Sequence, residues 1–260
     1  MISRAAILRC NGDGTHFPLL SPAPQMNPFD TSIVSFVNRF AHHSWVFDTF
    51  VFMISDNHLL KGGVVVALIW WAWFRPSVNQ LDSRKYLLCG VIACLLSVVV
   101  ARALADLLPF RERPIAVAAL HFQSPYGHSD EDLIHWSSFP SDHAAVFFAL
   151  ATSIFFAWRT GGIIALAHVV LFICLPRLYL GLHYPTDLVV GALIGIALAS
   201  IARAPVVRER IGRLAMPWLE YSPGSFYACL FVMTLQIVTL FESMRKIVHF
   251  FVVVLRPHVT

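Results

Sequence analysis

The sequence predicts an all-α fold: a polytopic transmembrane helical bundle of about six spans with an interfacial N-terminal helix. Composition is the first observation, because 57% of the 260 residues are hydrophobic and only 13% are charged. That balance is too apolar for an ordinary soluble domain. The second observation is that apolar runs of about 17 to 20 residues recur along the chain. The third is that basic residues gather in alternate connections between these runs, as membrane topology requires.

The N-terminal part combines a polar tail with two short apolar stretches. Residues 1–28 are rich in proline and glycine and lack the apolar core of a signal peptide, so we expect a flexible tail. Residues 31–43 mix apolar side chains with asparagine, arginine and histidine, which predicts a helix lying along the interface. Residues 45–54 are apolar but short, and the sequence leaves open whether residues 33–54 cross the membrane.

The next apolar run, residues 62–74, predicts a span that starts near Leu59 and ends in a tryptophan cluster typical of the membrane interface. In the run that follows, Arg102 and Asp106 are four residues apart and can pair on one helix face. A further apolar segment, residues 226–241, comes after a basic patch. We predict the other spans over residues 86–108, 144–158, 163–175 and 188–201.

These runs divide the chain into a tail over residues 1–28, a membrane-embedded domain over residues 29–204, and a basic cytoplasmic segment with an additional apolar helix over residues 205–260. The basic patch at residues 203–213 shares one side with the charged connection at residues 75–85 if each run crosses once. The positive-inside rule makes that side cytoplasmic, where the patch would also contact anionic lipid. We therefore expect a multi-pass protein of the inner (plasma) membrane.

Charge and cysteine usage exclude several other classes. The net charge of +4 is modest and requires no nucleic-acid partner. Four of the five cysteines lie inside apolar runs and none forms a Cys-x-x-Cys pair, which indicates buried residues rather than a disulfide framework or a zinc site. Three histidines near an acidic run are interpreted as an exposed polar cap, not a metal site, because no span fixes their geometry. They are His121, His128 and His135.

The stretch from residue 176 to residue 187 places Arg177, His183 and Asp187 between two apolar segments. Charged groups at membrane depth are costly and tend to be kept for function. Pro185 suits the first turn of a new helix, so His183 would precede a helix N-terminus with Asp187 close enough to orient its imidazole. The set offers an anion clamp, a nucleophile or base, and a carboxylate that fixes its tautomer. The alternative is a buried ion pair that closes a helix hairpin.

Two other polar pieces fall at span ends on the same side. Residues 109–114 carry Arg111 and Arg113, and residues 139–144 carry Ser141, Asp142 and His143 after a proline that marks a helix start. Helix N-termini present free N–H groups and bind anions. Two such ends and the arginines predict a site for a dianionic group. Phosphate fits better than carboxylate, since arginine forks bind its oxygens in pairs.

These residues resemble the type 2 phosphatidic acid phosphatase superfamily, which shares its site with vanadium haloperoxidases. Its signature is Lys-x6-Arg-Pro, then Pro-Ser-Gly-His, then Ser-Arg-x5-His-x3-Asp. The present chain follows this pattern over about residues 38–201. Arg113-Pro114 matches the first part and Pro140-Ser141-Asp142-His143 the second. Arg177, His183 and Asp187 match the third part at the right spacing. The motif Phe-Pro-Ser-Asp-His resembles the undecaprenyl diphosphate phosphatase branch. Three residues earlier in the chain add to this resemblance: Asn38, Asp48 and Ser55.

Three positions depart from the family pattern. Asp106 stands where the family has lysine, Asp142 where glycine is commoner, and Pro176 where serine precedes the arginine. The lost lysine removes one phosphate donor. We expect Arg111, two residues before Arg113, to replace it, because arginine prefers phosphate. The alternative is that Arg111 contacts a lipid headgroup.

The resemblance implies a mechanism. His183 attacks phosphorus and forms a phosphohistidine, Asp187 holds the reactive tautomer, and His143 protonates the leaving oxygen and then activates water. The resemblance also implies that arginine charge replaces a metal ion, so that no metal or other cofactor is needed. The expected catalytic residues are His183, His143 and Asp187, and the expected phosphate-binding residues are Arg113, Arg177, Ser141, Asp142 and Arg111.

The implied function is hydrolysis of a polyprenyl (undecaprenyl) diphosphate to the monophosphate at the periplasmic or outer face. The same chemistry on phosphatidate, phosphatidylglycerophosphate or a lipid A-type phosphate is a second hypothesis. A third is a non-enzymatic transporter or lipid-binding protein that only holds the headgroup, although mere binding would not need both histidines. The expected partners are a lipid phosphate substrate and membrane lipids, and neither the lipid tail nor the oligomeric state follows from the sequence.

Overall fold

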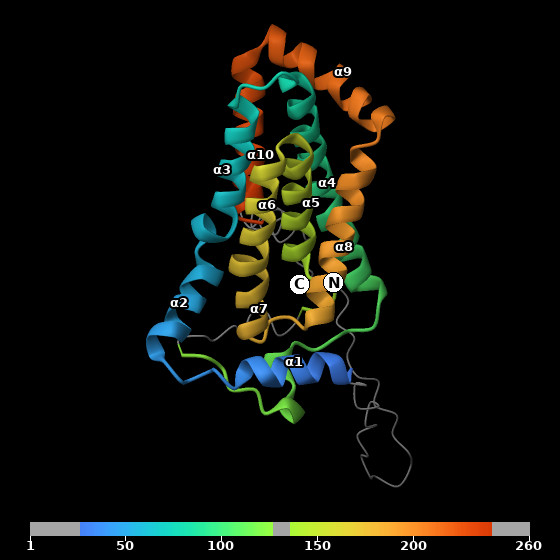
Figure 1. The fold of residues 1–260 in the computed structure, drawn as a ribbon. Coiled ribbons are helices and arrows are strands. Elements are labelled where there is room, and N and C mark those ends of the chain that lie inside the picture. Colours follow the sequence, from blue (N-terminus) through green and yellow to red (C-terminus); the bar gives the residue numbers. More distant parts are fainter. Residues whose placement is uncertain (1–26, 127–135, 241–260) are drawn as a thin grey trace, which may run out of the picture.

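The computed structural model describes residues 27–126 and 136–240, which form helices and no strand (Figure 1). Most helices stand upright in one bundle, while α1 (Pro28–Asn38) lies across one end and α9 (Pro205–Tyr221) crosses the other. The predicted all-α class is confirmed. The expected tail over residues 1–28 lies outside the described residues except for its last two positions.

Two N-terminal helices replace the continuous stretch 33–54 that the sequence left open. Asn27 caps α1, with its side chain accepting a hydrogen bond from the Phe29 N–H at 3.1 Å, and Pro28 takes the first position. The chain leaves the helix at residues 39–44. Ser44 then caps α2 (Trp45–Asp56). Residues 33–54 therefore do not form one helix, and the break comes where two exposed histidines interrupt the apolar pattern.

Asn38 and Asp48 connect α1 and α2 to the rest of the bundle through hydrogen bonds. The Asn38 amide donates to the carbonyl of Gln123 at 2.7 Å and accepts from its N–H at 2.9 Å. Asp48 is fully buried and accepts hydrogen bonds from the His42 N–H and the Tyr179 hydroxyl. Asn38 and Asp48 therefore have structural roles here.

Within residues 27–126 and 136–240, three helices are long and apolar enough to cross a membrane. They are α4 (Gln80–Leu107), the continuous helix Arg159–Tyr179, and α8 (Pro185–Ala202). A fourth exists if α2 and the segment Leu59–Phe74, which are bent by 67°, count as one span. The segment starts with a π-helical turn, η1 (Leu59–Gly63), and continues as α3 (Val64–Phe74). The expected number of about six spans stays a prediction.

The remaining elements complete the bundle. The continuous helix consists of α6 (Arg159–His168), the π-helical η5 (Val169–Cys174) and α7 (Leu175–Tyr179). Two apolar helices are shorter: α5 (Asp142–Ala157) and α10 (Pro223–Val238). Short 3₁₀ turns, η2 (Pro114–Ala116) and η3 (Ala118–Leu120), lie in the long polar connection.

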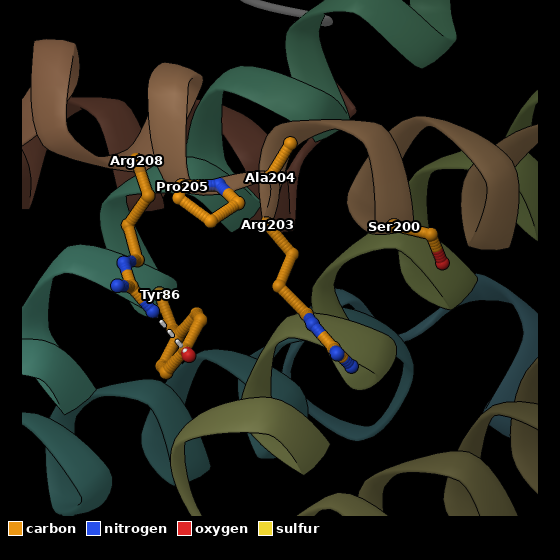
Figure 2. A pocket seen from close by; sticks show the side chains of 6 residues that line it. All are labelled: Tyr86, Ser200, Arg203, Ala204, Pro205 and Arg208. Atoms are coloured by element: carbon orange, nitrogen blue, oxygen red, sulfur yellow. Dashed lines mark hydrogen bonds between the residues drawn. The ribbon is translucent and has the colours of Figure 1, made fainter.

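The C-terminal helix α10 packs into the bundle core. Phe226, Leu230 and Ile237 join the largest apolar cluster of the described residues. Trp73 is 1% exposed and its indole N–H donates to the Tyr227 hydroxyl at 3.2 Å, so this tryptophan belongs to the core and not to the predicted interfacial belt. A pocket opens between α4, α8 and the start of α9 (Figure 2).

Helix α5 is the centre of the bundle, where α4, α6 and α8 pack around it. Its contact with α8 is backbone to backbone. A Cβ added at Gly191 would lie 2.4 Å from the Ser141 carbonyl oxygen, and one added at Gly195 would lie 2.2 Å from that of Ala145. Small residues four apart allow such an approach. The spacing Gly191, Gly195, Ala199 therefore sets the distance between α5 and α8.

This packing brings the three polar pieces to one end of the bundle. The end of α4 and the starts of α5 and α8 all lie near α1 (Figure 1). The connection between α4 and α5 is bonded to the turn before α8: the Ile115 N–H donates to the Gly181 carbonyl at 3.0 Å. Gly181 has φ +69°, a left-handed conformation that suits glycine. The predicted convergence of the polar pieces at one end is thus what the structure shows.

We predict that Gly195→Ala destabilises the protein by about 1–3 kcal/mol, because the added methyl group meets a backbone oxygen that cannot rotate away. Gly224→Ala is the control, since a Cβ there has no neighbour within 4 Å. Thermal unfolding in detergent measures both. Equal melting temperatures for the two variants would show that the α5–α8 contact is not tight.

Candidate active site

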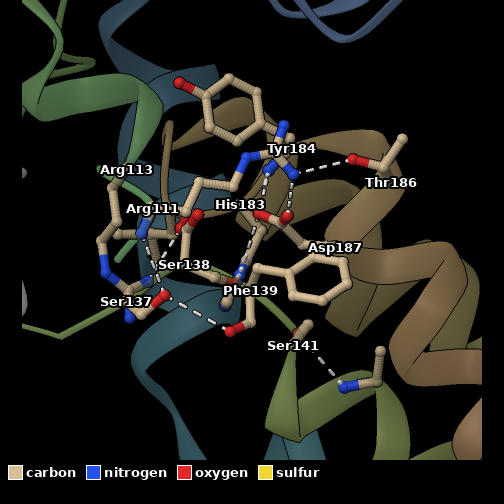
Figure 3. Close-up of polar contacts among 12 residues, drawn as sticks. Arg111, Arg113, Ser137, Ser138, Phe139, Ser141, His183, Tyr184, Thr186 and Asp187 are labelled. Carbon is tan, nitrogen blue, oxygen red and sulfur yellow. Dashed lines mark hydrogen bonds and ion pairs between the residues drawn. The ribbon is translucent and has the colours of Figure 1, made fainter. Parts of the chain in front are cut away.

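The polar pieces enclose a pocket at the α1 end of the bundle. Arg102 of α4 and Asp142 of α5 line it together with Arg113 and His183. Ala101, Ala105, Ser137 and Pro140 complete its wall. Figure 3 shows the polar contacts around His183 and Arg111. The pocket therefore combines two guanidinium groups, one imidazole and one carboxylate.

His183 is held in a single tautomer. Its side chain is buried, and Nδ1 lies 2.8 Å from the carbonyl oxygen of Ser138. A carbonyl oxygen can only accept, so Nδ1 must carry the proton. The lone pair of the neutral ring is then on Nε2. The connection that precedes α5 thus prepares Nε2 as a nucleophile.

Asp187 stands one helical turn behind this imidazole. Its Oδ2 lies 3.7 Å from His183 Nδ1 and accepts a hydrogen bond from the Tyr184 N–H at 2.8 Å. The sequence predicted that Asp187 holds the tautomer directly. The structure gives that hydrogen bond to the Ser138 carbonyl instead, because Asp187 is occupied in capping α8. Its negative charge still lies beside the ring.

The His183 imidazole favours its neutral form. Burial lowers its pKa below the ordinary value, and the guanidinium groups of Arg113 and Arg177 lower it further, while Asp187 opposes them. A neutral ring with a free Nε2 lone pair is the form that attacks phosphorus.

Arg111 does not line the pocket. Its guanidinium donates to Asp187 at 2.5 Å, to Asp30 at 2.6 Å and to the Thr186 hydroxyl at 2.9 Å. It also lies 4.1 Å above the ring of Tyr184. Two buried carboxylates therefore occupy its donors, and the expected replacement of the family lysine by Arg111 is not supported by this geometry. Arg111 instead connects α1 to the start of α8.

Arg102 brings its charge to the pocket in place of that lysine. It lies one turn before Asp106 on α4, and its ion pair is with Asp142 of α5 rather than with Asp106. Sequence analysis missed this role because spacing within one helix shows neighbours on that helix only. The signal was the presence of an arginine deep in an apolar run.

Asp142 orients His143. Its Oδ1 accepts the His143 backbone N–H at 2.8 Å and lies 2.9 Å from His143 Nδ1, while its other oxygen pairs with Arg102. The carboxylate was expected to bind phosphate, but a negative group repels phosphate and its oxygens are already engaged. Asp142 therefore fixes the tautomer of His143 and leaves Nε2 for proton transfer.

The other expected phosphate-binding residues differ in position. Arg113 is 7% exposed, lines the pocket and donates to the Leu182 carbonyl at 2.8 Å. Arg177 is 6% exposed and interacts electrostatically with both imidazoles. Ser141 is fully buried as the cap of α5, and its N–H donates to the Asp187 carbonyl at 3.1 Å. Ser141 thus joins α5 to α8, whereas Arg113 and Arg177 carry charge toward the imidazoles.

Two further charged residues were missed. Asp30 is buried at the start of α1 and accepts from the Thr186 N–H at 3.0 Å and from Arg111. Lys61 is buried in the π-helical turn at the α2–α3 bend, close enough to His143 to act on its charge. A single lysine inside an apolar run was the available signal.

Residues 27–126 and 136–240 contain no cluster of three His, Cys, Asp or Glu side chains suited to a metal ion. His121 belongs to this part of the chain and is exposed at the end of η3. His128 and His135 of the predicted polar cap lie outside the described residues.

Several known proteins are similar to this chain. Residues 85–210 match the PAP2 superfamily. The chain is 30% identical over 159 residues to YbjG of Escherichia coli, provisionally named an undecaprenyl-diphosphatase, covering 58% of this chain and 69% of that protein. It is 26% identical over 158 residues to the undecaprenyl-diphosphatase BcrC of Bacillus subtilis, covering 61% and 74%. The crystal structure of Aquifex aeolicus LpxE aligns with a TM-score of 0.48 at 23% identity, over 70% of this chain and 98% of that one.

We predict that Arg111→Met destabilises the protein by about 3–5 kcal/mol, because it leaves the buried Asp30 and Asp187 without their shared cation. Exposed Glu112→Gln is the control and should change stability by no more than about 0.5 kcal/mol. Thermal unfolding of both variants measures the effect. A stable Arg111→Met protein with weakened phosphate binding would contradict this prediction and would support the phosphate-binding role that the sequence predicted for Arg111.

Proposed function

This chain belongs to the PAP2 superfamily, and we propose that it is an integral membrane lipid phosphatase that hydrolyses a polyprenyl (undecaprenyl) diphosphate to the monophosphate. The observation that carries the proposal is the pair of oriented imidazoles. His183 lines a pocket that also contains arginines, with Nε2 free of the Nδ1 hydrogen bond. The Asp142 carboxylate holds His143. Such a pair performs nucleophilic attack and proton transfer around one phosphoryl group.

The first step transfers the terminal phosphoryl group to the enzyme. His183 Nε2 attacks phosphorus in line, and the bond between phosphorus and the bridging oxygen breaks. His143, entering as the imidazolium, gives its Nε2 proton to that oxygen, so the lipid monophosphate leaves. Burial and the Arg177 guanidinium lower the pKa of His143, and the Asp142 carboxylate opposes them by stabilising the charged ring before transfer. The product on the enzyme is a phosphohistidine.

The second step releases phosphate. Neutral His143 takes a proton from water, the hydroxide oxygen attacks phosphorus, and the bond to His183 Nε2 breaks. His143 is then again an imidazolium and the His183 ring is neutral, with its Nδ1–H still donating to the Ser138 carbonyl. Arg102, Arg113 and Arg177 would neutralise the charge on the equatorial oxygens, and such electrostatic stabilisation contributes most of the catalysis in phosphoryl transfer.

A diphosphate substrate fits the charge of the site. Besides the three arginines, Lys61 adds a positive charge that acts on His143 and would attract a second phosphate group. Two relatives carry names that specify undecaprenyl diphosphate. Monophosphate lipids such as phosphatidate remain the alternative substrate class, and they would give Lys61 no second phosphate group to attract.

A transporter is the alternative from a different class. A relative from Bacillus licheniformis, 26% identical over 165 residues and covering 62% of this chain and 72% of that protein, is named a bacitracin transport permease protein. A carrier needs cations to hold an anionic headgroup, but it does not need two imidazoles with fixed tautomers. The hydrogen bonds on His143 and His183 therefore favour the enzyme.

The proposed membrane arrangement has about six spans, with the site facing the periplasm or outside. Helix α1 would lie in the interface, because Phe29 and Phe36 are exposed while Asp30 and Val34 face the bundle. The basic residues of the opposite end would then face the cytoplasm.

His183→Ala should abolish release of phosphate from undecaprenyl diphosphate, a loss of roughly 10³-fold or more, since no nucleophile remains. Binding of the lipid should change far less because the arginines persist. Exposed His43→Ala is the matched histidine control and should keep full turnover. Turnover by the His183 variant at the parent rate would refute the phosphohistidine mechanism, and transport of the lipid by a parent protein that releases no phosphate would leave the carrier as the function.

The pH dependence follows from the lowered pKa of His183. Protonation removes the Nε2 lone pair, so on the acid side activity falls when the pH drops below that lowered pKa. The acid limb of kcat/KM should therefore have its midpoint below 6.5, the ordinary imidazole value. Initial rates over a pH series measure it. A midpoint above 6.5 would mean that Asp187 outweighs burial and the arginines.

Asp142→Asn should slow undecaprenyl diphosphate turnover about 10- to 100-fold by weakening the orientation and charge of His143. A second substrate, whose leaving group needs no acid, shows whether Asp142 acts through the orientation and charge of His143. Formation of the phosphoenzyme from this substrate, p-nitrophenyl phosphate, should slow by less than about fivefold. Equal slowing with both substrates would show that Asp142 only supports the fold.

A further inference from the structure

A second cation-lined pocket lies at the other end of α8 from the candidate active site (Figure 2). Its volume is about 500 Å³, and it opens where α8 ends and α9 begins. The 18 residues of α8 separate the two sites by about 27 Å of helix. The lining residues are Tyr86, Ser200, Arg203, Ala204, Pro205 and Arg208.

Aromatic rings hold both arginines in place. The Arg208 guanidinium lies 4.9 Å from the centre of the Tyr86 ring and donates to its hydroxyl at 2.5 Å. The Arg203 guanidinium lies 4.7 Å from the centre of the Phe156 ring. Figure 2 shows both side chains extending on the same side of the α8–α9 junction. A ring contact uses the flat face of a guanidinium and leaves its N–H edge for acceptors.

Nearby carboxylates offset only part of the positive charge of the pocket, because Glu209 is shared between Arg208 and Lys85. Glu209 accepts from Lys85 at 2.8 Å and from the Nε of Arg208 at 3.3 Å, and Asp82 lies 3.7 Å from Lys85. Within residues 27–126 and 136–240, Arg203 has the ring contact and no carboxylate within ion-pair distance. The start of α9 adds to this, since Ala204 offers no side-chain cap to its first N–H groups. The pocket therefore retains the capacity to bind an anion.

The surroundings indicate a lipid as the source of that anion. Ile201 is 62% exposed and Val206 is 66% exposed, and both are next in sequence to lining residues. Further along α9, Leu214 is 80% exposed. Exposed apolar side chains beside basic ones are typical of a helix in the membrane interface. An acyl chain could follow Ile201 while the phosphate enters between the arginines.

We propose that this pocket binds the phosphate of an anionic phospholipid headgroup in the leaflet at this end of the bundle. The bound lipid joins α4, α8 and α9 through one phosphate, since each helix contributes lining residues. This goes beyond contact between a basic patch and a charged surface, because it assigns a defined site to two arginines. It does not depend on the reaction proposed for the other end.

The test compares two double variants that remove the same charge. Arg203→Gln with Arg208→Gln empties the pocket of cations, and Arg210→Gln with Arg213→Gln removes exposed arginines of the same patch that do not line it. Native mass spectrometry of the full chain in detergent measures Kd for phosphatidylglycerol, with phosphatidylcholine as the neutral lipid. The pocket variant should lose about 25-fold in affinity, about fivefold for each charge removed. The control variant should change by less than about threefold.

Equal losses in the two double variants would mean a diffuse surface charge and would overturn the proposal. Ser200→Phe provides a second route, because it fills the pocket from an exposed position without changing charge. It should weaken phosphatidylglycerol binding as well, and unchanged binding would contradict the pocket. Inorganic phosphate at matched ionic strength tests the source. Displacement of the lipid by free phosphate at comparable concentration would assign the site to a soluble anion instead.

Discussion

The backbone contact between α5 and α8 is the constraint on which the rest of the structure depends. Gly191 and Gly195 remove the side chains that would hold the helices apart, and the Ser141 N–H then reaches the Asp187 carbonyl. That bond links the turn before His143 to the turn after His183. His143 lies in α5 and His183 lies in the turn before α8, so their separation follows from helix packing rather than from sequence spacing.

Charge pairing divides the arginines at this end into two groups. Arg111 satisfies the buried carboxylates of Asp30 and Asp187 and thereby holds α1 against α8. Arg102 and Arg113 line the pocket, where Arg102 also pairs with Asp142. A buried carboxylate without a cation is costly, so each acidic residue of the site requires a cationic partner. The number of arginines near the site therefore exceeds the number that can contact phosphate.

Sequence spacing predicted the parts of the site that lie within one segment, and it failed where two segments meet. The positions of His183 and Asp187 relative to a new helix follow from Pro185 and four-residue periodicity, and both are found as expected. The role of Arg111 could not follow, because its partner Asp30 lies 81 positions away along the chain. The apolar periodicity of residues 226–241 likewise identified a helix but not that α10 covers Trp73. Contacts between segments need the packing, which no single segment encodes.

The two departures from the family signature at the centre of the site are best understood as one change. A carboxylate at Asp142, where glycine is commoner, gives His143 a fixed orientation but brings a negative charge beside a phosphate pocket. Arg102 pairs with that carboxylate from one turn before Asp106, the position where the family has lysine. A lysine kept at that position would have served phosphate alone. In the proposed reaction the arginine would serve both, since a planar fork with five donors can contact a carboxylate on one edge and a phosphate on the other.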